Sequence, residues 1–318
     1  MIGKSMTEQK KDKVLLVGIG IMGNTIAQSF ACAGIDVALF NLKETSLARA
    51  MNRINSGLDT LVSIGKLTPK GKEETLSHIH CYQNLAEAAK DATFVMEVVP
   101  EVPATKKEMI AQICEACAPD AIIASNTSAL NVFEIVDVKN PERFIIAHYY
   151  SPAHIVPLVE VVPGPKTSKE TIAATVAILE KAGKSPVVMK KFGPGFIVNR
   201  IQRAIGECWM DMVEEGIAEP AEIDRAIKLS LGVRLPIVGI VQTMDFQGLD
   251  MLLDTQRNYG KVYSFVEELV KQGRLGSKTS KGIYDYQGRS EAEILCKRDE
   301  LFLKMIDFLK EIKAFDPV

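Results

Sequence analysis

Short apolar runs rich in β-branched residues alternate with helical segments between residues 13 and 190. The first such unit, "KVLLVGIGIMGNTIAQSFACAGIDVALFN", predicts a strand at Val14–Val17, a glycine turn, a helix from about Met22 that stops at Gly34, and a strand at Val37–Phe40. Further strands are expected around residues 93–97, 121–124, 144–147, 157–162 and 186–190. This alternation is typical of a parallel sheet whose two faces are covered by helices.

The pattern changes after the segment "FGPGFIVNR" (192–200). Apolar residues then recur at the spacing of one helical face, at Ile197, Ile201, Ile205, Trp209 and Met212. We therefore predict two domains, an α/β domain over residues 1–191 and an all-α domain over residues 192–318. The first ~12 residues are polar and are expected to form a disordered lead-in.

Length and composition fit this organisation and exclude some classes of partner. The chain has 318 residues, 47% of them hydrophobic, and a formal net charge of −2. A nearly neutral chain has no long-range attraction to phosphate backbones or anionic membranes, so neither nucleic acid nor membrane is expected as a partner. No apolar run approaches ~20 residues, and the start, "MIGKSMTEQKKDK", is charged where a secretion signal needs an apolar core. A cytoplasmic protein is predicted.

The six cysteines are scattered at irregular spacings, which favours a reducing compartment. Cys114 and Cys117 form a C-x-x-C pair inside the helical segment "EMIAQICEACA", but no second pair of metal ligands accompanies them. Buried thiols are therefore expected here, with no redox site and no metal.

A glycine turn, Gly18-x-Gly20-x-x-Gly23, lies between the first predicted strand and the first predicted helix. The first glycine makes the tight turn, the second lets the backbone approach a pyrophosphate, and the third packs the helix on the strand. The amide end of the helix then faces the phosphates. The motif predicts a Rossmann-type, doubly wound sheet that binds a dinucleotide through Gly18, Gly20, Ile21, Met22 and Gly23.

The residue that selects the cofactor is expected at the end of the second strand. A carboxylate there accepts hydrogen bonds from the adenosine ribose and repels a 2′-phosphate. This chain has Asn41 at that position, followed by Lys43, and asparagine provides only the hydrogen bond. NAD is the expected cofactor because no arginine follows the strand, and NADP stays open as an alternative.

The glycine turn is accompanied by "ASNTS" (124–128), "AHYYSPAHIVPLVEVV" (147–162), "GPGFIVNR" (193–200) and "LGSKTSKGIYDY" (275–286). Together these motifs resemble the L-3-hydroxyacyl-CoA dehydrogenase family, in the family's order and over most of the chain. The resemblance implies a hydride exchange between NAD and a 3-hydroxyacyl substrate. It also implies a homodimer that forms through the helical domain, whose apolar helix faces exceed the needs of one small bundle.

The resemblance assigns the reacting groups. The family's general acid and base is the histidine that opens an H-F-F-N-P motif, and a glutamate in the following strand holds it; His148 and Glu160 match these positions. The substrate oxygen is held by residues that match Ser128 and Asn199, for which helix capping is the alternative role. Chemistry agrees, because a histidine can exchange the hydroxyl proton near neutral pH and a carboxylate in an apolar strand needs a partner. His154 matches no family role and is expected at the surface or the substrate rim.

Three more positions carry a role through the resemblance alone. Glu101 and Lys106 match residues that line the nicotinamide half of the cofactor site, with a solvated helix start as the alternative. Ser151 replaces the asparagine of H-F-F-N-P, near the cofactor and the substrate.

The departures from the family pattern bear on the substrate. Lys66 is the only cation in "GLDTLVSIGKL", where the CoA enzymes carry basic residues for the CoA nucleotide. Arg234 stands in a segment expected near the mouth of the active site, where its guanidinium offers a fork for a carboxylate, although a surface helix end is the alternative. That region resembles the L-gulonate dehydrogenase and lambda-crystallin branch, whose substrates are free hydroxy acids. Three functions therefore compete: a 3-hydroxyacyl-CoA dehydrogenase, the same chemistry on a free 3-hydroxy acid, and a non-catalytic, crystallin-like protein that binds a nucleotide.

Overall fold

The computed structural model describes residues 11–316, which form two compact units that divide between Ala204 and Ile205. The predicted disordered lead-in falls mainly on residues 1–10, which lie outside the described residues. The last two residues of the predicted lead-in, Lys11 and Asp12, are ordered instead. Lys11 pairs with Asp36 at 2.8 Å, and Asp12 pairs with Lys181 at 2.7 Å.

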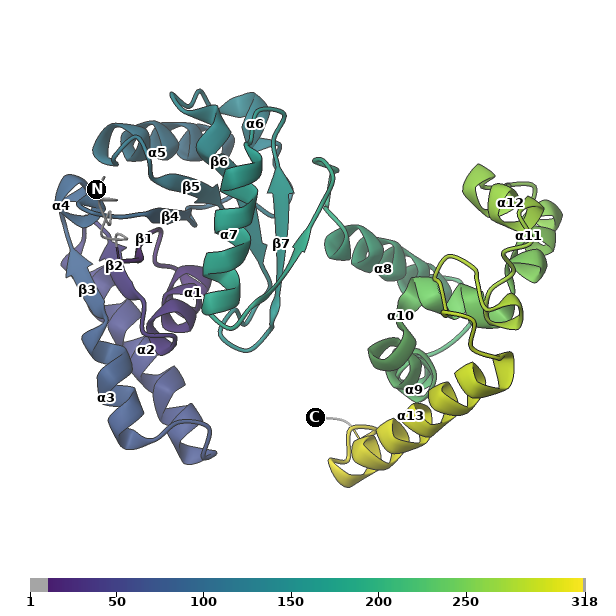
Figure 1. Cartoon of the computed structure of the whole chain (residues 1–318). Helices are drawn as coiled ribbons and strands as arrows, with labels where there is room; N and C mark the ends of the chain where they lie inside the picture. The colour runs from purple at the N-terminus through teal and green to yellow at the C-terminus, as the bar shows by residue number, and fades with distance from the viewer. Residues whose placement is uncertain (1–10, 317–318) are drawn as a thin grey trace, which may run out of the picture. The chain divides into compact units, whose positions relative to one another are not determined.

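An eight-stranded sheet forms the centre of the first unit, in the order β3-β2-β1-β4-β5-β6-β7-β8 (Figure 1). Its neighbouring strands are parallel except for the antiparallel pair β6 and β7. Successive strands are added on one side of β1 as far as β3 and then on its other side from β4 onward, which makes the sheet doubly wound and opens a crevice at the carboxyl ends of β1 and β4. The strands are β1 Lys13–Val17, β2 Asp36–Phe40, β3 Ile79–Tyr82, β4 Phe94–Glu97, β5 Ile122–Ser125, β6 Phe144–Tyr149, β7 Leu158–Pro163 and β8 Ser185–Val188.

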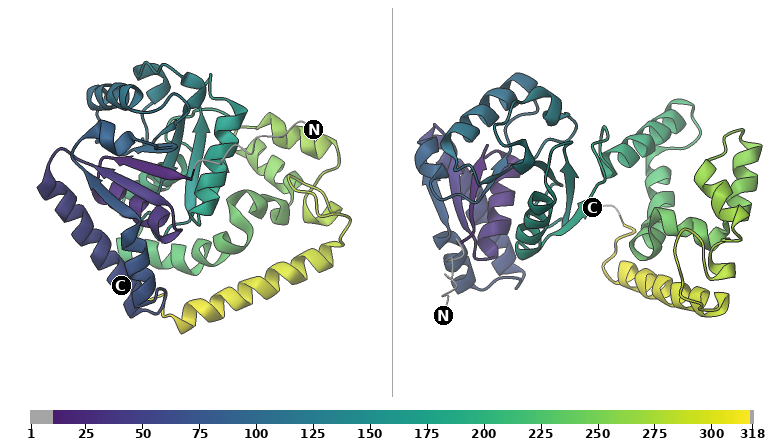
Figure 2. Two further views of the ribbon diagram at one scale, coloured as in Figure 1. Left: turned by 60° about the vertical axis from the view of Figure 1, so that its left-hand side comes forward. Right: turned by 45° about the horizontal axis from the view of Figure 1, so that its top comes forward.

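Helices cover both faces of this sheet (Figure 2). Side chains alternate along β1, so that Val14 and Leu16 enter one core while Leu15 and Val17 enter the other. The first core packs under α1 Ile21–Cys32, α2 Glu44–Ser63 and α7 Lys169–Lys181, with α3 Pro69–Ser77 against α1 and α2. The second packs under α4 Leu85–Ala89, α5 Pro103–Ala116 and α6 Val132–Ile135, and a short 3-10 turn, η1 Pro141–Arg143, precedes β6.

The strand β3 was not predicted. Its sequence "IHCY" shows no clear alternation, and only Ile79 is buried. It lies at the edge of the sheet and pairs with β2 alone, so its position depends on the neighbouring strand more than on its own apolar pattern.

The second unit is helical. The units divide at residue 204, inside α8, which spans Val198–Glu214. The other helices are α9 Pro220–Leu229, α10 Leu231–Gln247, α11 Leu249–Asn258, α12 Ser264–Lys271 and α13 Glu291–Glu311, with a 3-10 turn, η2 Ser277–Thr279. Asp245 is fully buried and accepts hydrogen bonds from the Ile283 and Tyr284 amides and from the Tyr286 hydroxyl, which ties the loop before α13 to α10.

No single helix in residues 11–316 combines the length and apolar character of a membrane span. The helices α9 and α10 reach the length and apolar character of a span only when they are joined, and a bend of 62° lies between them.

Candidate active site

The glycine turn between β1 and α1 has the backbone shape that a pyrophosphate needs. Gly18 has a φ of 99°, and a Cβ there would lie 2.5 Å from the Val98 backbone. A Cβ on Gly23 would lie 2.0 Å from the Gly18 carbonyl oxygen, which is the close contact of helix and strand. Gly20 precedes α1, and a Cβ there would meet no atom within 4 Å, so the space before the helix is open. Since no acidic side chain lies in the first turn of α1, this amide end suits an anion.

Asn41 follows β2, at the predicted adenosine end of this cleft. Its Oδ1 accepts a hydrogen bond from the Lys43 amide at 2.9 Å. A pocket of about 260 Å³ lies beside it and is lined by Ile19, Gly20, Asn41, Ser46, Arg49, Ala50 and Arg53. No arginine directly follows β2, as noted from the sequence, but α2 brings Arg49 and Arg53 to this pocket.

His148 and Glu160 face each other across the antiparallel strands β6 and β7. His148 Nδ1 lies 3.0 Å from Glu160 Oε2; the histidine is 4% exposed and the glutamate is fully buried. The other ring nitrogen, Nε2, has no hydrogen-bond partner among the described residues. Nδ1 therefore carries the proton shared with Glu160, and Nε2 is the nitrogen that can exchange a proton with a substrate.

Glu160 receives more hydrogen bonds than the histidine alone supplies. Its Oε1 accepts from the amides of Ile197 and Val198 at 2.9 and 3.0 Å, and its Oε2 also accepts from the Tyr150 hydroxyl at 2.7 Å. Burial raises the pKa of the Glu160 carboxyl, but the hydrogen bonds from His148, Tyr150 and the two amides outweigh it, so that the pKa lies below its usual value. Glu160 is thus held as a carboxylate.

Tyr150 is a site residue that sequence reasoning missed. Its ring lies 4.6 Å from the His148 ring between centroids, and its hydroxyl bonds Glu160. Burial and the contact with Glu160 raise the pKa of this hydroxyl, so it acts as a donor. The sequence could have indicated this role, because Tyr150 of the H-Y-Y-S-P motif adds a hydroxyl where the family's H-F-F-N-P motif has phenylalanine.

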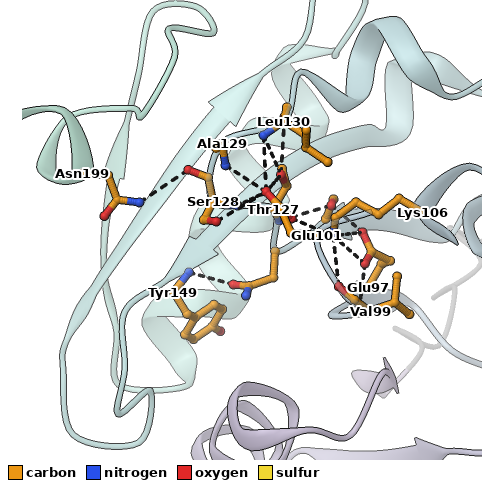
Figure 3. Close-up of polar contacts among 12 residues, drawn as sticks. Glu97, Val99, Glu101, Lys106, Thr127, Ser128, Ala129, Leu130, Tyr149 and Asn199 are labelled. Carbon is orange, nitrogen blue, oxygen red and sulfur yellow. Dashed lines mark hydrogen bonds and ion pairs between the residues drawn. The ribbon is translucent and has the colours of Figure 1, made fainter. Parts of the chain in front are cut away.

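Ser128 and Asn199 lie next to each other. The Asn199 Nδ2 lies 3.4 Å from the Ser128 carbonyl oxygen. Figure 3 marks this contact with a dashed line. Asn199 belongs to the first turn of α8, and Ser128 follows β5 in the loop before α6. The Tyr149 amide donates to the Asn126 Oδ1 at 2.8 Å, which joins this loop to β6, the strand that carries His148.

Glu101 shapes the loop that holds Ser128 (Figure 3). Its Oε1 accepts hydrogen bonds from the Thr127 hydroxyl at 2.6 Å and from the Ser128, Ala129 and Leu130 amides at 2.9 to 3.3 Å. Burial raises the pKa of Glu101, but these donors and nearby Lys106 lower it more, and the net shift is downward. The carboxylate therefore acts on the loop as an anionic cap.

Lys106 reaches the same group from inside the protein. It is 1% exposed, and its Nζ lies 2.9 Å from Glu97 Oε1 and 3.3 Å from Glu101 Oε2. Glu97 is fully buried, and it also accepts from the Ser125 hydroxyl at 2.5 Å. The alternative of a solvated helix start is wrong for Lys106. The Glu97–Lys106 pair was not predicted, although Glu97 ends the apolar strand β4, where a buried carboxylate requires a partner.

Two predicted residues of the loop after β6 do not join the His148 pair. Ser151 is exposed. His154 is half-buried, and its Nδ1 is enclosed without a hydrogen-bond partner in the described part of the chain. Burial and the neighbouring Lys184 lower the pKa of His154, which favours a neutral ring. His154 is therefore less exposed than a surface histidine, and its place at the substrate rim stays a prediction.

The C-x-x-C pair ends α5. Both Cys114 and Cys117 are free thiols of intermediate burial, less enclosed than the predicted buried pair. Burial raises the pKa of both, that of Cys117 to about 11, which keeps them protonated and unreactive. Within residues 11–316, no group of three or more histidine, cysteine or acidic side chains is arranged to hold a metal ion.

Arg234 lies in the first turn of α10, in the helical unit. Its Nη2 donates to the Ser230 hydroxyl at 3.0 Å, and it lines a pocket of about 120 Å³ with Arg298 and Phe302 of α13. It has no carboxylate partner in the described part of the chain.

Two models of one family match successive parts of the chain. Residues 13–192 match the 3-hydroxyacyl-CoA dehydrogenase, NAD binding domain, and residues 195–286 match the C-terminal domain of the same family. A probable 3-hydroxybutyryl-CoA dehydrogenase of Bacillus subtilis is 33% identical over 287 residues, which are 87% of this chain and 98% of that one. The human lambda-crystallin homolog is 34% identical over 244 residues, 75% of this chain and 76% of that one. The crystal structure of a 3-hydroxyacyl-CoA dehydrogenase from Archaeoglobus fulgidus superposes with a TM-score of 0.79 at 31% identity, over 94% of this chain and 99% of that one.

The chain therefore belongs to the 3-hydroxyacyl-CoA dehydrogenase family. Membership confirms the predicted family, the sheet domain with a helical second domain, the oxidoreductase class and NAD as the cofactor. The roles of the individual site residues and the domain boundary near Phe192 stay predictions.

Proposed function

We propose that this enzyme interconverts a 3-hydroxyacyl-CoA and its 3-oxoacyl form with NAD. The observation that carries the proposal is the His148–Glu160 pair, in which Nδ1 is bonded and Nε2 is free. The names of the relatives, which act on 3-hydroxyacyl thioesters, support the substrate class. A role in fatty acid metabolism and a cytoplasmic location are part of this proposal.

Each residue of the site has a proposed task. His148 Nε2 takes the proton of the substrate hydroxyl in the oxidation and returns it to the carbonyl oxygen in the reduction. Glu160 stabilises the imidazolium that forms, and Tyr150 and the amides of residues 197 and 198 keep Glu160 ionised. Ser128 and Asn199 hold the substrate oxygen beside the histidine. NAD, when bound, supplies the acceptor or donor of the hydride.

The cofactor is proposed to lie across the carboxyl ends of β1 and β4. Gly18, Gly20 and Gly23 leave room for its pyrophosphate, and Ile21 and Met22 begin the helix that faces it. The nicotinamide half is proposed to lie near Glu101 and Ser151. Lys106 acts there indirectly, through Glu101, because its own side chain is buried.

A second candidate is the same reaction on a free 3-hydroxy acid. Arg234 favours it, since its guanidinium carries no carboxylate partner in the described part of the chain and would pair with a substrate carboxylate. For assembly, we propose a homodimer through the helical unit.

The test is a spectrophotometric assay of NADH oxidation with acetoacetyl-CoA, free acetoacetate and sugar-acid substrates. We expect turnover with acetoacetyl-CoA to exceed that with the free acids. Turnover of free acids alone would establish the second candidate, and the Arg234→Met variant would then raise the KM for them. No turnover of any substrate, with NADH still bound, would contradict both.

A further inference from the structure

The pocket beside Asn41 has a chemical character that NAD does not require. It has a volume of about 260 Å³, and Gly20 and Ile19 form part of its wall, so it adjoins the glycine turn. In a doubly wound sheet this position, at the end of β2 and next to the turn, receives the adenosine ribose of a dinucleotide. The lining contains two arginines and no carboxylate.

The Asn41 side chain lines this pocket and has one hydrogen-bonding group still available. Its Oδ1 is engaged by the Lys43 amide at 2.9 Å, which identifies the oxygen and leaves Nδ2 as the group still available. An aspartate here would keep the bond to Lys43 and present a second, negative oxygen instead of an NH₂ group. The asparagine therefore removes a repulsive charge and adds a hydrogen-bond donor to phosphate oxygens.

Arg49 and Arg53 are four residues apart and therefore share one face of α2. Both side chains are exposed, and neither has a hydrogen-bond or ion-pair partner among the described residues. The hydroxyl-bearing Ser46 lines the same pocket, one helical turn before Arg49. Two guanidinium groups without acidic partners make a site that attracts a dianion and can bind it with paired N–H groups.

We propose that this pocket accepts a phosphate on the adenosine ribose of the cofactor, so that the enzyme uses NADP(H) as well as NAD(H). The inference rests on the proposed function, because it places the cofactor's adenosine half beside Gly20 and Asn41. The 3′-phosphate of the CoA nucleotide is a second source of the same chemistry. The position of the pocket, at the glycine turn, favours the 2′-phosphate of the dinucleotide.

Calorimetric titration of the full chain tests the proposal without relying on turnover. The ligands are 5′-AMP, adenosine 2′,5′-bisphosphate, adenosine 3′,5′-bisphosphate and NAD⁺. We expect the 2′,5′-bisphosphate to bind at least about tenfold more tightly than 5′-AMP and than the 3′,5′ isomer, through charge-assisted hydrogen bonds. The Arg49→Met/Arg53→Met variant should lose this advantage and keep its affinity for NAD⁺ within about threefold.

Two further variants sharpen the result. Asn41→Asp should weaken binding of the 2′,5′-bisphosphate and lower kcat/KM for NADPH relative to NADH, by repulsion of the phosphate. Lys70→Met removes a positive charge that lies outside the pocket, on α3. This control variant should change neither the binding of the 2′,5′-bisphosphate nor the kcat/KM for NADPH relative to NADH. Equal binding of 5′-AMP and the 2′,5′-bisphosphate, with NAD⁺ still bound, would overturn this inference and leave the proposed function intact. Preference for the 3′,5′ isomer would assign the pocket to CoA, and failure to bind NAD⁺ would contradict the proposed function itself.

Discussion

His148 and Glu160 occupy paired positions on antiparallel strands, and the Nδ1 and Oε2 atoms of their side chains are 3.0 Å apart. They are twelve positions apart in the chain, so the pairing depends on the turn of the loop between β6 and β7. Both side chains are held inside the sheet domain. The imidazole is thereby fixed through one nitrogen, with the other left for a substrate.

We predict that His148→Gln lowers kcat by roughly 100-fold or more, the range of a lost general base, while NADH binding is retained. Glutamine keeps a polar side chain of similar length but cannot accept and release the proton. Steady-state kinetics with acetoacetyl-CoA and a fluorescence titration of NADH measure the two effects. His154→Gln is the matched control and should change kcat only a few-fold. An equal loss in both variants would reverse the choice of histidine.

The adjacent tyrosines should respond in opposite ways to the loss of a hydroxyl. The Tyr150 hydroxyl donates to the buried Glu160 carboxylate, so Tyr150→Phe should cost roughly 1.5–3 kcal/mol of unfolding free energy, typical of a hydrogen bond to a charged group. The Tyr149 hydroxyl is buried and has no hydrogen-bond partner among the described residues. Tyr149→Phe should therefore be neutral or stabilising. Urea unfolding of the two variants provides the comparison, and a larger loss for Tyr149→Phe would contradict this account.

Lys106 and Glu97 should show strong energetic coupling. Lys106→Met leaves a carboxylate fully buried without its cation, which costs roughly 3–5 kcal/mol in comparable buried pairs. The double variant Glu97→Gln/Lys106→Met should lose less stability than the sum of the single variants, with a coupling of at least about 1 kcal/mol. A double-mutant cycle by denaturant unfolding measures it. Simple additivity would mean that the two charges stabilise the domain independently.

Glu160 should make stability depend on pH in the acidic range. Its pKa in the folded protein lies below the usual value of 4.5, because hydrogen bonds to the carboxylate outweigh the effect of burial. A lowered pKa contributes stability above the unfolded pKa, and this contribution is lost as the pH falls through the folded pKa. We therefore expect Glu160→Gln to lose less stability than the wild type between about pH 6 and pH 3. The exposed Glu180→Gln variant serves as the control and should follow the wild-type curve. Coincident slopes for the wild type and Glu160→Gln would refute the prediction.

The homodimer is tested by light scattering coupled to gel filtration. Apolar side chains of the helical unit, among them Trp209, Ile217 and Met251, are 42%, 64% and 63% exposed in the chain. A two-fold interface would cover such surface, so we expect a mass of about twice 34.9 kDa at micromolar concentration. A monomeric mass would contradict the proposal.

The sequence by itself determined the main parts of this protein because their signals are local. Apolar runs at β1, β4, β5 and β7 and the helical spacing after Phe192 predicted the sheet domain and the helical domain. The glycine turn was readable since Gly18 and Gly23 have no space for a side chain, and the motifs around His148 and Glu160 carried the family. The strand β3 was missed, because an edge strand depends on its neighbour more than on its own pattern.

Only the tertiary structure decided which distant residues meet. It brought Lys106 into contact with Glu97 and Glu101. The sequence had predicted a residue that lines the cofactor site or lies at a solvated helix start, whereas the structure shows a buried ion pair. It turned Tyr150 onto Glu160, and it returned Arg49 and Arg53 to the end of the strand that Asn41 follows. The physical reason is that periodicity reports which side of an element is buried, whereas the partner of a buried charge is chosen by how helices and strands pack.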